Sequence, residues 1–240
     1  LRFLTAHHPS AYSIDRTDGA NPIRQPLENL RFAGTLYGAI IYQKAPIVMR
    51  HLENRLGEEV FREGMREYLS TYAYGNATWL DLIAILDARS EQDLATWSQV
   101  WVEESNRPLI NIFREGGDII VQQQDPENRG RMWPQTLEMR IGSIQESKTL
   151  TIELGFEPQR LSGLAKAEFI LPNGSGVEYG EFILDTQSQA YLVSNVNQLD
   201  TALLRGATWV TLWDQLLAER LAPSLFLKTA LDSLAIEQDQ

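Results

Sequence analysis

The sequence predicts an α+β chain with more than one domain, in which a helical layer precedes an antiparallel β-sandwich and further helices follow. Three observations support this prediction. Apolar residues recur every three or four positions from Pro46 to Ser105, as they do on the buried face of a helix. From Asn106 onward the spacing changes to two, which is the period of a strand. Near Ser194 the helical spacing returns.

The composition bounds the class of protein. At 240 residues, 43% of them hydrophobic, the chain is long enough to bury more than one core. A net charge of −11 argues against nucleic-acid binding, which requires a basic surface. No apolar stretch approaches the roughly 20 residues of a membrane span. The absence of cysteine excludes disulfides and thiolate metal sites. The compartment stays open, with a cytoplasmic location slightly favoured.

The first 36 residues contain turn-forming pairs such as Asp18-Gly19 and Asn21-Pro22, which predict a short helix followed by an extended excursion. His7 and His8 are adjacent and do not share a helix face, so we interpret them as surface histidines rather than a metal pair. These residues lack the basic region and apolar core of a signal peptide. The chain begins without Met, which suggests a segment excised from a longer protein.

Four helices are expected next. The first runs from Pro46 to Leu56, because Pro is favoured in a first turn and a glycine follows directly. The others begin near Glu58, at Thr78 and at Ser90, and the last two starts resemble capping boxes. The side chains predicted to face inward are Val48, Met49, Leu52, Leu56, Phe61, Met65, Tyr68, Leu69, Tyr72, Trp79, Leu82, Ile83, Leu86, Leu94, Trp97 and Trp101.

His51 lies on the first of these helices and opens the run His-Leu-Glu-Asn-Arg. A zinc-binding His-Glu-x-x-His motif needs a second histidine one helical turn further on, and Arg55 stands at that place. We therefore interpret His51 as a helix-surface residue or a core residue with its hydrogen bonds satisfied, and not as a metal ligand.

The strand region opens with a hairpin whose turn lies at Glu115-Gly116-Gly117. Asp125–Gly130 is expected to form an exposed turn, and Pro172–Gly176 a β turn rather than a phosphate-binding loop, because no helix follows it. Six to seven short strands favour an antiparallel sandwich. Beyond the hairpin, strands are expected at residues 135–141, 148–154, 167–171 and 177–185.

Three helical segments are expected after Ser194, the last of them opened by Pro223. Without partners they would leave apolar surface exposed, so they resemble the beginning of a further domain. Their apolar positions are Leu199, Leu203, Leu204, Trp209, Leu212, Trp213, Leu216, Leu217, Leu225, Phe226, Leu227 and Leu231.

Four stretches of the chain, taken in order, resemble one known family. They are Tyr42-Gln43-Lys44-Ala45, then Leu56–Phe61 with Tyr68-Leu69 and Tyr72–Ala77, then Asp93–Val102 with Pro108, and then Leu171–Asn173 with Tyr179 and Asn197–Arg205. The family is the M1 class of gluzincin aminopeptidases, which includes aminopeptidase N and leukotriene A4 hydrolase. The first stretch resembles its Tyr-x-Lys-Gly-Ala signature, and the ordered matches cover nearly the whole chain.

The resemblance implies a three-part organisation. Residues 1–106 would be the helical end of a thermolysin-like catalytic domain, 107–193 an Ig-like β-sandwich, and 194–240 the start of a C-terminal helical domain. It also implies a zinc-dependent metallopeptidase that hydrolyses the N-terminal peptide bond of a peptide substrate.

The resemblance implies a catalytic role for Tyr42. In this family the signature tyrosine donates a hydrogen bond to the tetrahedral intermediate formed when zinc-bound water attacks a peptide carbonyl. A phenol keeps its proton at neutral pH, and a fixed neutral donor stabilises a developing oxyanion. Tyr37 is a second and weaker candidate, because a further active-site tyrosine occurs near this place in some relatives.

The sequence also departs from the family pattern. Ala45-Pro46 replaces Gly-Ala, and because a residue before proline is pushed toward extended geometry, we expect the helix to start at Pro46. The sequence contains no His-Glu-x-x-His and no Gly-x-Met-Glu-Asn. In the family these motifs and a further zinc-binding Glu precede the tyrosine. Zinc and the general base are therefore expected on residues outside this chain, which by itself is expected to be inactive.

Two other interpretations stay open. A non-catalytic M1-like scaffold or peptide-binding module would share these helices and strands while its full-length protein lacked the zinc motif. A free-standing sandwich adhesion module explains the strands but not the helical layer before them. Substrate preference and oligomeric state cannot be assigned from these residues.

Overall fold

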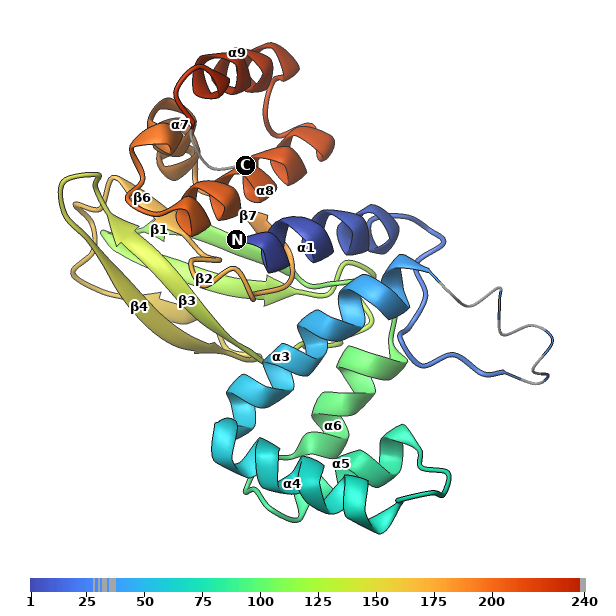
Figure 1. Cartoon of the computed structure of the whole chain (residues 1–240). Coiled ribbons are helices and arrows are strands. Elements are labelled where there is room, and N and C mark those ends of the chain that lie inside the picture. The colour runs from blue at the N-terminus through green and yellow to red at the C-terminus, as the bar shows by residue number, and fades with distance from the viewer. Residues whose placement is uncertain (28, 30, 32–33, 35–37, 238–240) are drawn as a thin grey trace. The chain divides into compact units, whose positions relative to one another are not determined.

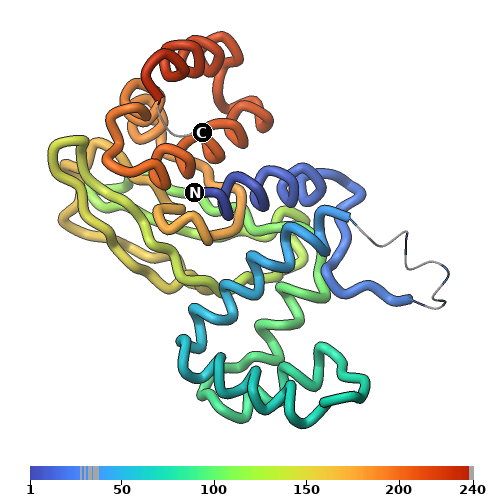
Figure 2. The backbone as a smooth tube through the Cα atoms, viewed as in Figure 1, coloured from blue at the N-terminus to red at the C-terminus, as the bar shows by residue number. Residues whose placement is uncertain are grey.

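The computed structural model describes residues 1–27, 29, 31, 34 and 38–237. They form two compact units, one made of Ser10–Asn106 and the other of Leu1–Pro9 with Arg107–Gln240. The boundary at Pro9 falls inside the first helix. Figure 1 labels the elements, and Figure 2 traces the backbone in the same view. Within the described residues, no helix combines the length and the apolar character that a membrane crossing requires.

The unit of residues 10–106 is helical in all the regular elements that the structure describes for it (Figure 1). The helix at the start is longer than the short one predicted. Leu4, His8 and Ala11 are buried at helical spacing, and the free energy gained by burying them outweighs the loss of one backbone hydrogen bond at Pro9, which has no N–H. The elements are α1 (Arg2–Asp15), the π-helical turn η2 (Ile40–Lys44), α3 (Ala45–Leu56), α4 (Glu58–Thr71), α5 (Trp79–Asp87), α6 (Leu94–Ser98) and the π-helical turn η3 (Gln99–Glu103).

The predicted capping box of α5 is confirmed. The Thr78 hydroxyl accepts from the Asp81 amide at 3.3 Å, and the Thr78 amide donates to the Asp81 carboxylate at 2.8 Å. The cap predicted at Ser90 is wrong. Asp93 caps α6 instead, because its carboxylate accepts from the Thr96 amide at 2.9 Å.

Most side chains predicted to face inward from the helices do so, and Leu69 is the exception with 64% of its surface exposed. The reason is that α4 contacts α5 through Gly64, where a Cβ would lie 2.4 Å from Leu86. Leu69 lies on another face. The fully buried ones are Val48, Leu52, Leu82, Ile83, Leu86, Leu94, Trp97 and Trp101, and the half-buried ones are Met49, Leu56, Phe61, Met65, Tyr68, Tyr72 and Trp79.

The second unit contains two small sheets. One has the strand order β5-β2-β1-β7 and the other β4-β3-β6. The predicted hairpin is confirmed, since β1 and β2 pair antiparallel and the turn glycines Gly116 and Gly117 adopt φ of 60° and 90°. The strands are β1 (Leu109–Glu115), β2 (Asp118–Gln124), β3 (Gln135–Gly142), β4 (Ser147–Leu154), β5 (Gln159–Leu161), β6 (Phe169–Leu171) and β7 (Glu181–Ile183).

Three details of the strand prediction are wrong. The prediction did not include the strand β5. The last two predicted strands, β6 and β7, are each only three residues long. β7 runs parallel to β1, whereas the prediction was fully antiparallel. The chain leaves β6 in one sheet and enters the other through the turn at Pro172–Gly176 and the residues after it. Alternation of apolar residues indicates a strand but not its direction, so the pattern could not reveal this pairing.

Apolar side chains from both sheets form a single core. This supports sheets that pack face to face, with each strand alternating between the core and the other surface. The fold class observed is α+β, with helices and two small, mostly antiparallel sheets. The core residues are Ile110, Ile112, Ile119, Val121, Leu137, Met139, Ile141, Ile152, Leu154, Ala167, Ile170 and Phe182.

Asp125 corrects the expectation of a fully exposed turn at Asp125–Gly130. Its carboxylate is 4% exposed and accepts from the side chain of Arg131 at 2.7 Å and from backbone amides of the turn. Burial acts to raise the pKa of Asp125, but the hydrogen bonds from Arg131 outweigh it and hold that pKa below its usual range. The Pro172–Gly176 turn is confirmed.

The helices at the end of the chain begin earlier than expected, with α7 capped by Asp185 rather than starting near Ser194. Two predicted segments are one helix, α8, which continues through Gly206. A Cβ there would lie 2.3 Å from the Leu1 side chain, so the close approach of the two segments favours glycine. Pro223 opens α9 as predicted. The elements are α7 (Thr186–Asn195), the 3-10 turn η4 (Val196–Gln198), α8 (Ala202–Leu217) and α9 (Pro223–Leu234).

The expected exposure of apolar side chains near the end of the chain is observed on α9. The buried residues of this helix are Thr229 and Ser233, whereas its leucines face solvent. The exposed apolar side chains on and next to α9 are Leu225, Leu227, Leu231, Leu234 and Ile236.

Candidate functional site

Tyr42 lies at the centre of η2 and is 56% exposed. Its amide donates to the Gly38 carbonyl at 3.1 Å. Ile40 and Lys44, two residues to either side, are both buried. Residues two apart lie on nearly opposite sides of a helical turn, so burial of the two flanking side chains directs Tyr42 outward. π-helical turns next to α-helices are frequent at functional sites.

The backbone before Pro46 differs from the expected one. Lys44 (φ −71°, ψ −45°) and Ala45 (φ −57°, ψ −42°) are both helical, so α3 begins at Ala45 and continues η2 without a break. The Ala45 amide donates to the carbonyl of Ile40, five residues earlier. This wider turn moves the preceding carbonyls away from the Pro46 ring, which has no N–H to pair with them, and the helix therefore tolerates proline.

The ammonium group of Lys44 holds the end of η2 from inside the unit. Its Nζ lies 2.7 Å from Oδ2 of Asp15, and neither side chain is exposed. The same Nζ donates to the backbone carbonyl of Asn106 at 2.6 Å. Lys44 thus contacts Asp15, the last residue of α1, and Asn106, the last residue of this unit.

The second tyrosine candidate, Tyr37, lies outside the described residues, so its prediction stays as it was. His51, in contrast, is placed clearly. It is buried, and its ring meets Trp101 edge to face at a centroid distance of 4.9 Å. Of the two interpretations of His51, the structure supports the core residue and excludes the helix-surface residue.

The described residues do not fit a zinc ion. Among them, no group of three or more His, Asp or Glu side chains is placed so that it could hold a metal. Tyr42 offers a phenol hydroxyl at the surface, and a phenol can donate a hydrogen bond to a ligand without changing its charge.

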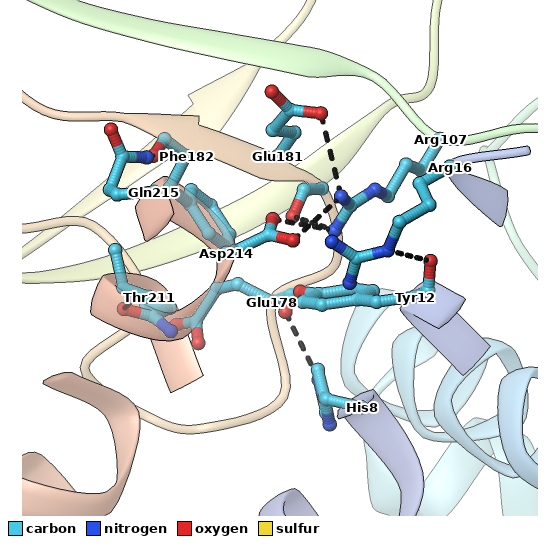
Figure 3. A network of polar contacts seen from close by, with 12 residues as sticks. His8, Tyr12, Arg16, Arg107, Glu178, Glu181, Phe182, Thr211, Asp214 and Gln215 are labelled. Carbon is cyan, nitrogen blue, oxygen red and sulfur yellow. Dashed lines mark hydrogen bonds and ion pairs between the residues drawn. The ribbon is translucent and has the colours of Figure 1, made fainter. Parts of the chain in front are cut away.

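His8 is buried, which overturns its interpretation as a surface residue. It follows Leu4 by one helical turn, so both side chains lie on the buried face of α1. Its Nε2 lies 3.2 Å from the Glu178 carbonyl (Figure 3), and since a carbonyl only accepts, Nε2 is the protonated nitrogen. The adjacency of His7 and His8 gave no signal for this burial.

The carboxylate of Glu178 is buried in the same unit. It accepts from the Glu138 amide at 2.9 Å, the Ser175 hydroxyl at 2.8 Å and the Val177 amide at 3.2 Å. Burial raises the pKa of Glu178 to about 7, and the hydrogen bonds oppose that shift. These donors all come from the sheet and the turn beside it, so we interpret Glu178 as a residue that holds the turn.

A second buried polar cluster joins Arg107 to α8 (Figure 3). The guanidinium lies 2.8 Å from the Asp214 carboxylate and 3.4 Å from that of Glu181, and it donates to the Gly180 carbonyl. On the same helix, the Gln215 amide donates to the Phe182 carbonyl. All these partners belong to the protein itself, so the cluster is a structural anchor of α8 on the strand β7.

A cavity that carries aromatic side chains lies elsewhere. A cavity of about 880 Å³ lies between the first turns of α1 and the helices α8 and α9. Trp209, Trp213 and Phe226 line it, together with the ion pair of Arg205 and Glu237. Tyr42, the candidate for chemistry that lies within the described residues, does not line this cavity.

Comparison with known proteins identifies part of the chain. Residues 2–105 match the family model described as the Peptidase family M1 domain. This part of the chain belongs to peptidase family M1. The match includes Tyr42, Lys44 and Asp15, so the surface tyrosine and its buried neighbour both lie within the M1 part.

Three curated relatives are aminopeptidases by name. Aminopeptidase N of Streptomyces lividans is 25% identical over 250 residues, which cover 95% of this chain and 29% of that protein. Aminopeptidase N of Lactobacillus helveticus is 26% identical over 214 residues, covering 82% and 24%. Aminopeptidase 2, mitochondrial, of Saccharomyces cerevisiae is 28% identical over 124 residues, covering 52% and 13%. The chain thus spans less than a third of the length of these M1 relatives.

Proposed function

We propose that this chain is part of a longer zinc-dependent aminopeptidase that hydrolyses N-terminal peptide bonds, and that Tyr42 stabilises the oxyanion in that reaction. The observation that carries the proposal is an exposed tyrosine on a π-helical turn, followed by a buried lysine, within the residues that match the M1 domain. The relatives' names support the reaction class.

The role proposed for Tyr42 follows from the chemistry of its hydroxyl. When water attacks a peptide carbonyl, negative charge develops on the carbonyl oxygen. A neutral donor held in place for that oxygen stabilises the transition state more than the ground state. The exposure of Tyr42 leaves its side chain accessible to a ligand.

The organisation proposed for the chain is the one that the family resemblance implies. Residues 1–106 would end a thermolysin-like catalytic domain, 107–193 would form an Ig-like sandwich, and 194–240 would begin a helical domain. The shared core of the two sheets supports the sandwich. Zinc and the general base would be held by the longer protein, and the 240 residues alone would then be inactive, since one hydroxyl donor does not replace a base.

The test uses the full-length protein with zinc and an aminoacyl-arylamide substrate. We expect Tyr42→Phe to lower kcat by roughly 10²- to 10³-fold, the usual loss when one oxyanion donor is removed. The matched control is Tyr74→Phe, at an exposed tyrosine between α4 and α5, which should leave kcat unchanged. Wild-type turnover in the Tyr42 variant would show that the catalytic assignment is wrong.

The same assay separates the enzyme from the alternative, a non-catalytic M1-like scaffold. A full-length protein without turnover in the presence of zinc, and without a His-Glu-x-x-His upstream of these residues, would favour the scaffold. Tyr42 would then be a surface residue available to a bound peptide.

A further inference from the structure

Lys44 differs from the other lysines of the chain. The sequence contains four, all within the described residues, and Lys148, Lys166 and Lys228 are exposed. Lys44 alone among them is completely buried. Lysine is almost never fully buried unless its ammonium is paired, because removing that charge from water is costly. Lys44, whose buried charge carries this desolvation cost, lies two positions after Tyr42.

The contacts of Lys44 join three separate segments of one unit. Its ammonium pairs with Asp15 at the end of α1 and donates to the carbonyl of Asn106, which follows η3. Asn106 adopts a positive φ of 71°, a conformation that asparagine tolerates better than most residues. Charge-assisted bonds of this kind are short and directional. The end of η2 therefore has a fixed position relative to both segments.

This fixed position also determines where Tyr42 points. Ile40 and Lys44 are buried at the two ends of η2, and Tyr42 lies midway on the opposite side. If the end at Lys44 were released, the turn could rotate about its axis or relax to an ordinary α-helical turn. Either change would displace the tyrosine hydroxyl.

We propose that Lys44 is a positioning residue for the hydroxyl of Tyr42, acting through its ion pair with Asp15 and its hydrogen bond to the Asn106 carbonyl. The proposal rests on the function proposed above for Tyr42. A catalytic donor must be held to within a fraction of an ångström, and a displacement of about 1 Å can cost roughly 10²-fold in rate. The rigid attachment of η2 meets this requirement.

A variant that removes only the lysine is a poor test, because it takes away a cation that faces the buried Asp15 carboxylate and could unfold the unit. The double variant Lys44→Met with Asp15→Leu removes both charges and fills the space with apolar atoms. Such replacements of a buried pair often preserve stability. If Lys44 serves only stability, this double variant should behave like the wild type in every respect.

The first measurement needs no catalysis and uses the 240-residue chain. Amide hydrogen exchange is followed in the double variant and in the control Lys166→Met, at an exposed lysine. We expect the amides of residues 38–45 to exchange at least tenfold faster in the double variant, while those of α5 and the control stay at the wild-type rate. Unchanged exchange across residues 38–45 would overturn the proposal.

The second measurement is made in the full-length enzyme. We expect the double variant to lower kcat by 10- to 100-fold with KM within twofold of wild type, and to cause no further loss when Tyr42 is already Phe. Wild-type kcat in the double variant, with Tyr42→Phe impaired, would overturn the role of Lys44 and leave the proposed function intact. Wild-type kcat in Tyr42→Phe would instead overturn the proposed function, while the exchange measurement still reports on Lys44.

Discussion

Arg107 and Asp214 form a buried ion pair, with Nη1 of the arginine 2.8 Å from Oδ2 of the aspartate and the side chains 3% and 4% exposed. The arginine precedes the first strand, and the aspartate lies on α8. The pair therefore ties the start of the sheet to a helix that comes more than a hundred residues later (Figure 3).

Breaking this pair should be costly. We expect Arg107→Met to lower the free energy of unfolding by about 3–5 kcal/mol, because it removes the cation that faces a buried carboxylate. The control Arg160→Met breaks exposed ion pairs with Glu115 and Asp118 and should cost less than about 1 kcal/mol. Urea titration of the 240-residue chain, followed by circular dichroism, measures both. Equal losses in the two variants would contradict the structural role of the buried pair.

Glu178 should make the stability of its unit depend on pH. Its pKa is raised from 4.5 to about 7 in the folded state, so its contribution is fully present below about pH 4.5 and is lost as pH rises through 7. The stability of the wild type relative to Glu178→Gln should therefore fall by about 2–3 kcal/mol between pH 5 and pH 8.

The measurement for Glu178 is a pair of urea titrations at each pH. Glu157→Gln, at an exposed position, is the control and should follow the wild type at both values. A constant difference between wild type and Glu178→Gln from pH 5 to pH 8 would show that the buried carboxyl titrates as it does in water.

Gly174 should not accept a side chain. A Cβ there would lie 2.5 Å from the carbonyl oxygen of Glu138, which accepts a hydrogen bond from the Gly174 amide at 2.8 Å. We expect Gly174→Ala to destabilise the chain by about 1–3 kcal/mol, because backbone atoms must move. Gly155→Ala, where nothing lies within 4 Å of the new Cβ, should be neutral or slightly stabilising. Thermal unfolding compares the two, and equal melting temperatures would refute the expectation.

The features that the sequence predicted correctly depend on neighbouring residues. The glycine pair of the first hairpin, the box formed by Thr78 and Asp81 and the helix start at Pro223 all follow from local backbone chemistry. Periodicity also identified the tryptophans buried in the helical unit. Such signals lie within a few residues of each other, so one sequence is sufficient to detect them.

The features that it missed depend on residues distant in the chain. Nothing near His8 indicates that it packs beside the Glu178 carbonyl, 170 residues later. Likewise, the parallel pairing of β7 and the partners of Lys44 arise only when the chain has folded. Tyr42 was found through a family signature rather than through its own chemistry, and its catalytic role stays a prediction.

The π-helical turn at Ile40–Lys44 is sensitive to the deletion of a single codon in the gene. This turn contains one residue more than an α-helical turn, and one codon encodes that extra residue. Loss of that codon at Gln43 would let the turn close into an ordinary helix without disturbing α3. Tyr42 and the lysine would then be neighbours, about 100° apart around the axis instead of nearly opposite. A three-nucleotide deletion would therefore leave the fold intact and still change the direction in which the tyrosine points.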